Sequence, residues 1–491
     1  MEKSSTWPAL VFATSDKAAS KRILQARRDG QLREIAPRVY SSDLTSDPAA
    51  IIRRHFVLVL GHLFPEAVLS HRSGIEAQPT ADGHIFLTYK YTKKIKLPGL
   101  VVHLLEGPDA QPGDRPFGGL RLYFASEPRA LLENLQPGRT RGGISKSLPV
   151  AAVEERLESI LRARGEASLN DLRDEARAVA QALGWETEFA QLRNIIGALL
   201  VTHPSKLLTS PVARARAVGW PYDPDRVALF TTLMTAVQQA VLPDVPDPAP
   251  VVPAYYDLAF FEAYFSNFIE GTVFQVDEAH QIVSLNQPLA NRHADSHDVL
   301  GTYHLVGNPV EMRQVPTSAD HFLALLQQRH RALMTGRPDK RPGEWKERAN
   351  EAGSTSFVEP ALVRGTLRQG YDLYQSIVHP LGRAMMMMFL VSEVHPFDDG
   401  NGRLARIMMN AELVSGGCCR IIIPTVSRQD YVLALRRLSR QRDPGLYLRM
   451  MVKAQAFVGT LQPDSYELLK AQFTASNAFE EANDEVQLRL L

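Results

Sequence analysis

Residues 395–406, HPFDDGNGRLAR, combine residue types that can together handle a nucleoside triphosphate. His395 is neutral near pH 7 and can take a proton from an incoming hydroxyl group. Asp399 supplies hard carboxylate oxygens, which suit an Mg²⁺ ion that bridges phosphate oxygens. These two side chains therefore predict a base and a metal ligand within one short segment.

The second half of this segment is suited to binding an anion. The backbone N–H groups of Gly400, Asn401 and Gly402 can turn inward, and the helix that follows adds its N-terminal partial charge. Arg403 and Arg406 stand three positions apart on that helix, so both face the same anion. The segment therefore predicts the transfer of a phosphate-linked group.

The composition predicts a soluble protein of several domains. A chain of 491 residues is too long for one hydrophobic core. Its net charge of +1 excludes a polycation that binds nucleic acid with its whole surface, so such a role would need a local patch. The only cysteines, Cys418 and Cys419, are adjacent and form neither a disulfide framework nor a zinc site. Because there is neither a run of about 18 apolar residues nor a signal-peptide pattern, we expect a cytoplasmic protein without a membrane span.

Residues 1–145 predict an α+β region with a small basic domain at its start. Residues 15–28 are typical of a capped helix, and two short strands follow. Seven basic residues oppose three acidic ones in this stretch: Lys17, Lys21, Arg22, Arg27, Arg28, Arg33 and Arg38. A helix followed by a basic wing is the layout of a winged helix-turn-helix, so residues 17–38 could bind DNA. The alternative is a small domain with a solvated basic face. As far as about residue 105, the region resembles the AbiEi-type antitoxin regulators, which begin with a small winged helix.

Three further segments differ in composition. Residues 146–241 show apolar positions at helical spacing and predict a helical spacer domain. Residues 242–253 contain five prolines and predict a stiff linker. Residues 461–491 predict a C-terminal helical tail. Between the linker and the tail, residues 254–460 predict a helical domain, whose aromatic stripe at 254–268 is typical of core packing.

The segment 395–406 resembles the signature of the Fic domain family, His-Pro-Phe-x-acid-Gly-Asn-Gly-Arg-x-x-Arg, at every constrained position. The resemblance extends over roughly residues 254–460. It implies an all-helical domain with the signature in a loop between two central helices. The resulting fold class is mainly α: an all-helical C-terminal Fic domain, preceded by a helical spacer and an N-terminal α+β winged-helix-like region.

Most Fic domains transfer AMP from ATP to a hydroxyl side chain of a protein and release pyrophosphate. The resemblance implies that His395 is the general base for a Ser, Thr or Tyr hydroxyl and that Asp399 binds Mg²⁺. It assigns Arg403 to the β-phosphate and Arg406 to the γ-phosphate of ATP. The α- and β-phosphates would be cradled by Gly400, Asn401 and Gly402.

The resemblance also suggests contacts for the nucleoside and for the target protein. Asn410 stands where family members often contact the nucleoside, and Tyr431 falls in the stretch that walls the adenine pocket. Residues 353–359 lie where the family places a flap that holds the target by strand addition. Gly353 and Phe357 would belong to this flap, with Phe357 as its hydrophobic clamp. An ordinary surface turn is the alternative.

A second motif predicts inhibition. Ser266, Glu270 and Gly271 fit the inhibitory pattern of the family, Ser/Thr-x-x-x-Glu-Gly/Asn. In that pattern the glutamate pairs with the second arginine of the loop, here Arg406, and repels the γ-phosphate of ATP. Ser266 would brace the inhibitory helix. Taken alone, Glu270 could be a solvated residue at a helix end.

Several functions remain open at this stage. The first is a self-inhibited protein adenylyltransferase that modifies a protein target or itself. The second is a DNA-binding regulator, similar to an antitoxin, whose Fic domain senses nucleotide or modifies a partner. Removal of AMP from a target and transfer from another nucleotide are also compatible with the residues. The sequence leaves the target and the oligomeric state undetermined.

Overall fold

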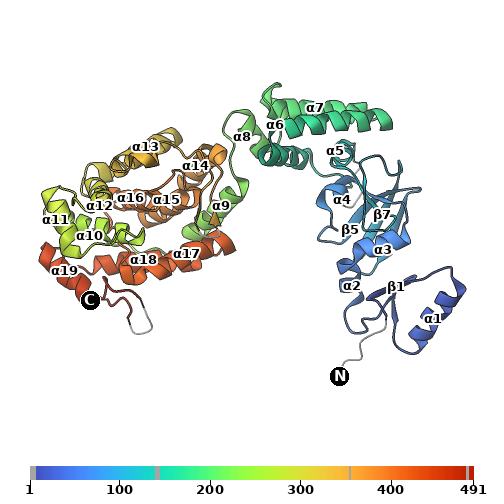
Figure 1. Cartoon of the computed structure of the whole chain (residues 1–491), viewed down its shortest axis with the longest axis horizontal. Coiled ribbons are helices and arrows are strands. Elements are labelled where there is room, and N and C mark those ends of the chain that lie inside the picture. The colour runs from blue at the N-terminus through green and yellow to red at the C-terminus, as the bar shows by residue number, and fades with distance from the viewer. Residues whose placement is uncertain (1–6, 139–143, 353–354, 483–485, 491) are drawn as a thin grey trace. The chain divides into compact units, whose positions relative to one another are not determined.

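The computed structural model of the protein describes residues 7–138, 144–352, 355–482 and 486–490 (Figure 1). Internal contacts divide the chain into two units, Met1–Val218 and Gly219–Leu491. The first unit contains two β-sheets and eight α-helices, whereas the described part of the second is almost wholly helical. This confirms the predicted fold class, mainly α with an α+β region at the N-terminus.

The first unit begins with a small sheet and one helix. Asp16 caps that helix, because its Oδ1 accepts a hydrogen bond of 2.6 Å from the N–H of Ala19. Ile23 and Ala26 are buried on the helix face that meets the sheet. The strands form an antiparallel sheet in the order β1-β3-β2. The elements are β1 (Leu10–Phe12), α1 (Lys17–Arg28), β2 (Arg33–Ala36) and β3 (Val39–Ser41).

A six-stranded sheet follows, in the order β6-β7-β5-β4-β9-β8. Its two longest strands, β5 and β7, run parallel and bury Leu87, Val102 and Leu104. The strands are β4 (Val68–Leu69), β5 (His84–Tyr89), β6 (Lys93–Leu97), β7 (Leu100–Glu106), β8 (Arg115–Pro116) and β9 (Tyr123–Phe124). The helices are α2 (Pro48–Arg54), α3 (Phe56–Leu63), α4 (His71–Glu76) and α5 (Glu127–Leu135).

Three helices complete the first unit. The longest of them kinks at Gly165, where φ is +80° and the helical backbone is interrupted. The kink produces two limbs whose apolar faces, with those of α5 and α7, enclose one core. The helices are α6 (Val150–Leu183), α7 (Glu186–Leu199) and α8 (Pro211–Ala217).

The second unit is built around α15 and α16, which the other helices surround (Figure 1). Helix α15 is apolar on nearly all sides, including the four buried methionines 385–388, and such a helix is stable only inside a protein. The aromatic residues Phe260, Phe261 and Phe265 of α10 are buried, which confirms that this stripe is core. The helices before the loop are α9 (Pro224–Gln239), α10 (Ala254–Ile269), α11 (Val276–Leu285), α12 (His293–Val306), α13 (Ala319–Leu333), α14 (Val363–Tyr374) and α15 (Pro380–Val394). Those after it are α16 (Asn401–Ser415), α17 (Arg428–Gln441), α18 (Gly445–Gly459) and α19 (Tyr466–Ala475), and two short strands are β10 (Glu351–Ala352) and β11 (Thr355–Ser356).

Helix α9, which the sequence placed in the spacer, packs within the second unit. Its residues Phe230, Leu233 and Val237 are buried in the same core as α14 and α15, and the rings of Phe230 and Phe389 meet edge to face at 6.0 Å. The proline-rich segment is also attached to this unit, because the N–H of Cys419 donates to the carbonyl of Val245 at 2.8 Å. Local periodicity identified α9 as a helix but could not show which core would bury it.

Gly365 of α14 marks a close approach to the segment before α9, and its replacement with alanine should destabilise the second unit. A Cβ atom there would lie 2.1 Å from the carbonyl oxygen of Pro221 and 2.6 Å from that of Trp220, so the backbone must shift. We expect Gly365→Ala to lower the free energy of unfolding by about 1–3 kcal/mol. Urea unfolding of the full chain measures this, with Gly445→Ala as the control. At Gly445 a Cβ would meet only ends of flexible side chains. Equal stability of the two variants would contradict the prediction.

Candidate active site

The segment 395–400 forms a loop between the two central helices. Helix α15 ends at His395, whose φ of +52° turns the chain, and α16 begins after Gly400, whose φ is +71°. Asn401 closes the loop from the first turn of α16. Its Oδ1 accepts from the N–H of Phe397 at 2.9 Å, and its Nδ2 donates to the Phe397 carbonyl at 2.8 Å. The amide of Asn401 therefore fixes the shape of the loop.

Two aromatic residues outside the predicted site, His330 and Trp345, support the loop. The buried ring of Phe397 stacks on His330 at 3.8 Å and on Trp345 at 5.0 Å. The N–H of Gly343 donates to Nδ1 of His330 at 2.8 Å, which assigns the proton of that ring to Nε2. Nε2 then donates to the Asp399 carbonyl at 3.0 Å. Burial lowers the pKa of His330 to about 4, so the ring holds the loop in its neutral form. No local signal marks His330, which lies 65 residues before His395 in the sequence.

His395 presents one ring nitrogen to the cavity described below. Its Nδ1 lies 3.1 Å from the carbonyl oxygen of Ser392, which assigns the proton to Nδ1 and leaves Nε2 as an acceptor. The ring of Phe357 stacks on the imidazole at 3.8 Å with the planes 7° apart. Burial lowers the pKa of His395 to about 4, and the charge of Lys346 acts in the same direction. The imidazole is therefore a neutral base at physiological pH.

Arg406 is held by the end of helix α10. Its Nη2 lies 2.6 Å from Glu270 Oε1 and 2.9 Å from the Ser266 carbonyl, and its Nε donates to Ser266 Oγ at 2.9 Å. Burial alone would raise the pKa of Glu270, but Arg406 outweighs it and the pKa is lowered. A Cβ added to Gly402 would lie 2.2 Å from Glu270 Oε1. The carboxylate therefore lies directly against the predicted phosphate cradle, while the adjacent Gly271 is exposed with φ of +91°.

Arg403 is engaged by a different acid. Its Nη1 lies 2.9 Å from Oδ1 of Asp298 on α12, and both side chains are buried. Arg337 contacts the other carboxylate oxygen of Asp298 at 2.5 Å. The Nε of Arg403 is buried without a hydrogen-bond partner among the described residues. Both arginines of the predicted anion site are thus paired with carboxylates.

Asn410 lies in the interior of the second unit, and its role toward the nucleoside stays a prediction. Its side chain is fully buried, and Nδ2 donates to Glu262 at 2.8 Å and to the Ile421 carbonyl at 2.9 Å. Its Oδ1 accepts from the N–H of Ile421 at 2.8 Å. Because Glu262 is also paired with the buried Arg420, this amide belongs to a structural network in the core.

One cavity of about 250 Å³ brings six of the predicted residues together: Glu270, Phe357, His395, Gly402, Arg406 and Tyr431. Its polar end contains Glu270, His395, Gly402 and Arg406, and Tyr431 lines it farther along. The remaining lining combines the apolar Ile269, Phe357, Val432 and Leu435 with the polar Thr355, Ser392, Glu393, Arg436 and Ser439. Asp399 lies outside this lining and is exposed, with Oδ1 accepting from the N–H of Gly400 at 2.7 Å. Gly353 lies outside the described residues.

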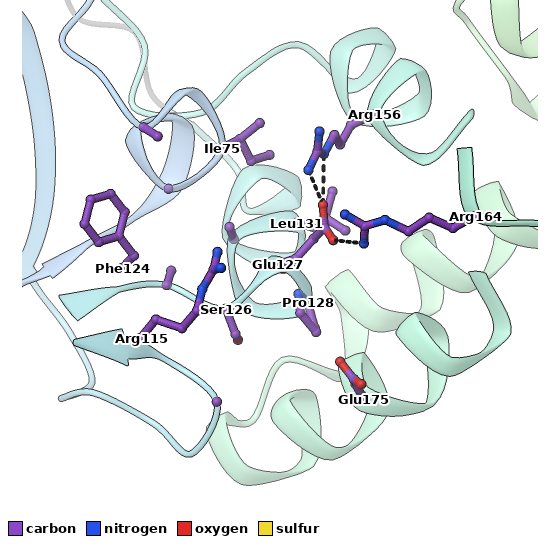
Figure 2. Close-up of a pocket in the computed structure, with 15 residues that line it drawn as sticks. Ile75, Arg115, Phe124, Ser126, Glu127, Pro128, Leu131, Arg156, Arg164 and Glu175 are labelled. Carbon is purple, nitrogen blue, oxygen red and sulfur yellow. Dashed lines mark hydrogen bonds and ion pairs between the residues drawn. The ribbon is translucent and has the colours of Figure 1, made fainter. Parts of the chain in front are cut away.

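A larger cavity, of about 500 Å³, lies in the first unit and contains none of the predicted residues (Figure 2). Its charged side chains are in part paired with one another. Glu127 accepts from Nε of Arg156 at 2.9 Å and from Nη1 of Arg164 at 3.3 Å. Neither histidine nor cysteine is among its described lining residues, so acid–base chemistry is better supported in the smaller cavity.

The described residues contain neither a preformed metal cluster nor a helix that could span a membrane. No group of three or more His, Cys, Asp or Glu side chains could hold a metal ion by itself. Among the same residues, no helix is long and apolar enough to cross a membrane. Mg²⁺ beside phosphates is commonly held by one or two carboxylates together with phosphate oxygens and water, a role for which Asp399 has the right chemistry.

Comparison with known proteins identifies the class to which this loop belongs. The Fic/DOC family model matches residues 320–413, which span the loop and both central helices. These residues are therefore a Fic domain, as the motif predicted. The winged helix of the AbiEi type stays a prediction.

The relatives match only a part of the chain. A "Protein adenylyltransferase Fic" of Drosophila willistoni is 24% identical over 203 residues, and that of Drosophila melanogaster is 24% identical over 205 residues. Each match covers 39% of this chain and 40% of the relative, so the chain matches less than half the length of these proteins. The solved structure of Fic-1 from C. elegans covers 67% of this chain and 98% of its own, at 17% identity and a TM-score of 0.36.

Proposed function

We propose that this protein transfers AMP from ATP to a hydroxyl side chain of a protein and that Glu270 restrains the reaction. The observation that carries the proposal is the shared cavity, in which a neutral His395 lies beside Arg406 paired to Glu270. The name of the Drosophila relatives, protein adenylyltransferase, supports the same reaction. The target could be another protein or this chain itself.

The residues provide a base and an anion site for in-line displacement at the α-phosphate. Nε2 of His395 accepts the hydroxyl proton as that oxygen forms a bond to the α-phosphorus, and the bond to the β-phosphate oxygen breaks to release pyrophosphate. Arg403, Arg406 and the N–H groups of Gly400, Asn401 and Gly402 balance the phosphate charge. Asp399, an exposed carboxylate next to this site, would hold Mg²⁺, which supplies further charge neutralisation when bound.

The same geometry explains why the resting protein would be restrained. The Glu270 carboxylate takes up the guanidinium group that the γ-phosphate would contact, and its charge repels that phosphate. Its contact with Gly402 places it where a phosphate oxygen would approach the cradle. ATP would therefore bind in an unproductive position until Glu270 moves. The same carboxylate could orient a water molecule for removal of AMP, so the direction of the reaction needs a direct test.

The rim of the cavity supports a place for the target. Strands β10 and β11 form a short antiparallel pair, and Phe357 follows β11 directly over His395. A target segment that adds to β11 would bring its hydroxyl to the imidazole, with Phe357 as the clamp. This proposal extends the predicted flap to the described residues 355–359.

Labelled nucleotides test the proposed function. The full chain carrying Glu270→Gly is incubated with cell lysate, Mg²⁺ and ATP, GTP, CTP or UTP, each labelled at the α-phosphate. We expect protein-bound label from ATP above the other three, and no label when His395→Ala is added. Absence of label from all four nucleotides would refute nucleotidyl transfer, and preference for another nucleotide would refute the choice of AMP.

A second candidate function, DNA binding, is supported by the exposed basic face of α1. Ile23 and Ala26 face the sheet, while Lys17, Lys21 and Arg22 lie on the exposed side. We expect Lys21→Glu/Arg22→Glu to abolish a salt-dependent gel shift with duplex DNA, because each lost cation removes a phosphate contact. Arg162→Glu/Arg193→Glu changes the net charge equally on other helices and should leave the shift intact. Equal loss of the gel shift in both double variants would show that DNA binding depends on net charge alone, and would contradict a specific role of α1.

A further inference from the structure

The strand that carries Phe357 is attached to the domain from two sides. Among the strands that the structure describes, β11 pairs only with β10, through Glu351–Ser356 and Ala352–Thr355. A pair this short has little stability of its own. Nη2 of Arg226, on α9, donates to the carbonyl oxygen of Ser356 at 2.6 Å. Nη2 of Arg440, on α17, donates to Thr355 Oγ1 at 2.8 Å. Of these two contacts, only that of Arg226 holds the strand backbone itself.

The other end of the Arg226 guanidinium reaches the helix that carries His395. Its Nη1 pairs with Oε1 of Glu393, whose side chain is 5% exposed. Glu393 lies on the last turn of α15, two residues before His395, and also accepts from Ser439 Oγ at 2.9 Å. Burial raises the pKa of Glu393, and Arg226 opposes that effect. One guanidinium group thus joins the rim strand to the end of α15, in a fork geometry that lysine cannot reproduce.

We propose that Arg226 is a positioning residue of this active site, which fixes β11 against α15 and so holds Phe357 over the His395 imidazole. Arg226 precedes the residues that the family model matches, 320–413, so the Fic signature gives no indication of it. Its consequence for catalysis rests on the proposed function. The effect of Arg226 on the environment of His395 is independent of the proposed function.

Arg226 acts on His395 through the ring of Phe357 and not through its own charge. The charged groups that act on His395 are Lys346, Glu270 and Asp399, whereas burial has the largest effect. Arg226 is not among them, so it influences the imidazole through the ring of Phe357. If β11 is released, Phe357 leaves the imidazole, water reaches the ring and its protonated form becomes easier to reach.

The test measures the protonation of His395 in the full chain. Histidine ring resonances are titrated by NMR in a ¹³C-histidine-labelled protein, and His395→Ala identifies the resonance. We expect Arg226→Ala to raise the pKa of His395 from about 4 toward 6.5. The control is Arg437→Ala, which removes an exposed arginine of α17 that pairs with Asp443. This variant should leave the titration of His395 unchanged. Arg226→Lys should be intermediate, because an ammonium group can keep one contact but not both.

Two further variants separate positioning from loss of folding and from a direct effect. Arg226→Ala leaves Glu393 buried without its cation, so Arg226→Ala/Glu393→Gln, which removes that charge, should show the same shift in a stably folded protein. Phe357→Ala should reproduce the shift, and adding Arg226→Ala to it should produce no further change. An unchanged His395 titration in both Arg226 variants, or additive shifts with Phe357→Ala, would overturn the proposal.

Activity provides an independent readout. In the Glu270→Gly background, Arg226→Ala should move the acid limb of AMP transfer to higher pH, in parallel with the His395 titration. If Glu270→Gly protein transfers no label and the titration still shifts, the proposed function fails and the positioning role stands. If label is transferred and the His395 titration does not respond to the Arg226 variants, the positioning role fails and the proposed function stands.

Discussion

Replacing Glu270 with glycine is expected to raise the rate of AMP transfer to protein by about 10- to 150-fold, the range that corresponds to one charge-assisted hydrogen bond. The carboxylate contacts Arg406 at 2.6 Å and lies against Gly402, so its removal frees both the guanidinium group and the cradle. Arg406 keeps its two contacts with Ser266, so the arginine stays in place. Initial rates of α-phosphate label transfer to protein measure the effect.

Matched variants distinguish release of the arginine from other causes. Glu270→Gln keeps the shape of the side chain but removes its charge, so it should activate less than Glu270→Gly, because the amide still occupies the cradle. Ser266→Ala should activate weakly, since it removes one contact of Arg406 and leaves the ion pair. Glu270→Gly/His395→Ala should lose this gain, because the general base is absent. Equal rates in wild type and Glu270→Gly would contradict restraint by this carboxylate.

Local spacing in the sequence was sufficient for the loop. The positions of His395, Gly400 and Arg406 follow from a turn between two helices and from the three-residue spacing on the second. The contact of Glu270 with Arg406 follows from a second motif, although 136 residues separate the two. Such motifs work because each residue has one geometric task that few other residue types can perform.

Contacts set by the core could not be read in the same way. The spacing of Asn410 suits a nucleoside contact, but Glu262 and Ile421 occupy its amide in the interior. The partner of Arg403, Asp298, lies on a helix with no motif of its own. Arg226 stands in a helix whose periodicity resembles that of the preceding spacer. These pairings depend on which helices share a core, and a single sequence does not specify that.

The helix packing itself shows the same limit. Gly365 is an unfavourable residue in the first turn of α14, because glycine costs about 1 kcal/mol relative to alanine in a helix. The structure supplies the reason, because the carbonyl oxygens of Trp220 and Pro221 lie where a Cβ atom of residue 365 would be. A local conflict with helix propensity therefore marked a tertiary contact, but it did not identify the segment involved.

His395→Ala is expected to lower AMP transfer by the Glu270→Gly protein by about 10²- to 10⁴-fold, the usual contribution of a general base. The pH dependence tests the same role more sharply. Burial lowers the pKa of His395 to about 4, so its neutral form persists well below the ordinary value of 6.5. The value of kcat/KM for ATP, which reports the free enzyme, should therefore stay level from about pH 8 to pH 5 and fall only as the pH approaches 4. The charge of Glu270 raises the pKa of His395, so removing Glu270 should not move the acid limb of the rate profile to higher pH.

The stability of the protein should respond to the same group with a definite sign. In the unfolded chain His395 takes up a proton as the pH falls through 6.5, whereas in the folded protein it does so only near 4. The unfolded state binds more protons in that window, so the free energy of unfolding decreases as the pH falls from 6.5 to 4. His330, whose pKa is also about 4, contributes in the same direction. His395→Ala should reduce this slope in urea unfolding measured from pH 7 to pH 4.5, and Phe357→Ala should reduce it through greater exposure of the ring. A rate limb near pH 6.5, together with an unchanged slope in His395→Ala, would show that the imidazole is not held in the buried, neutral form on which its role as a base depends.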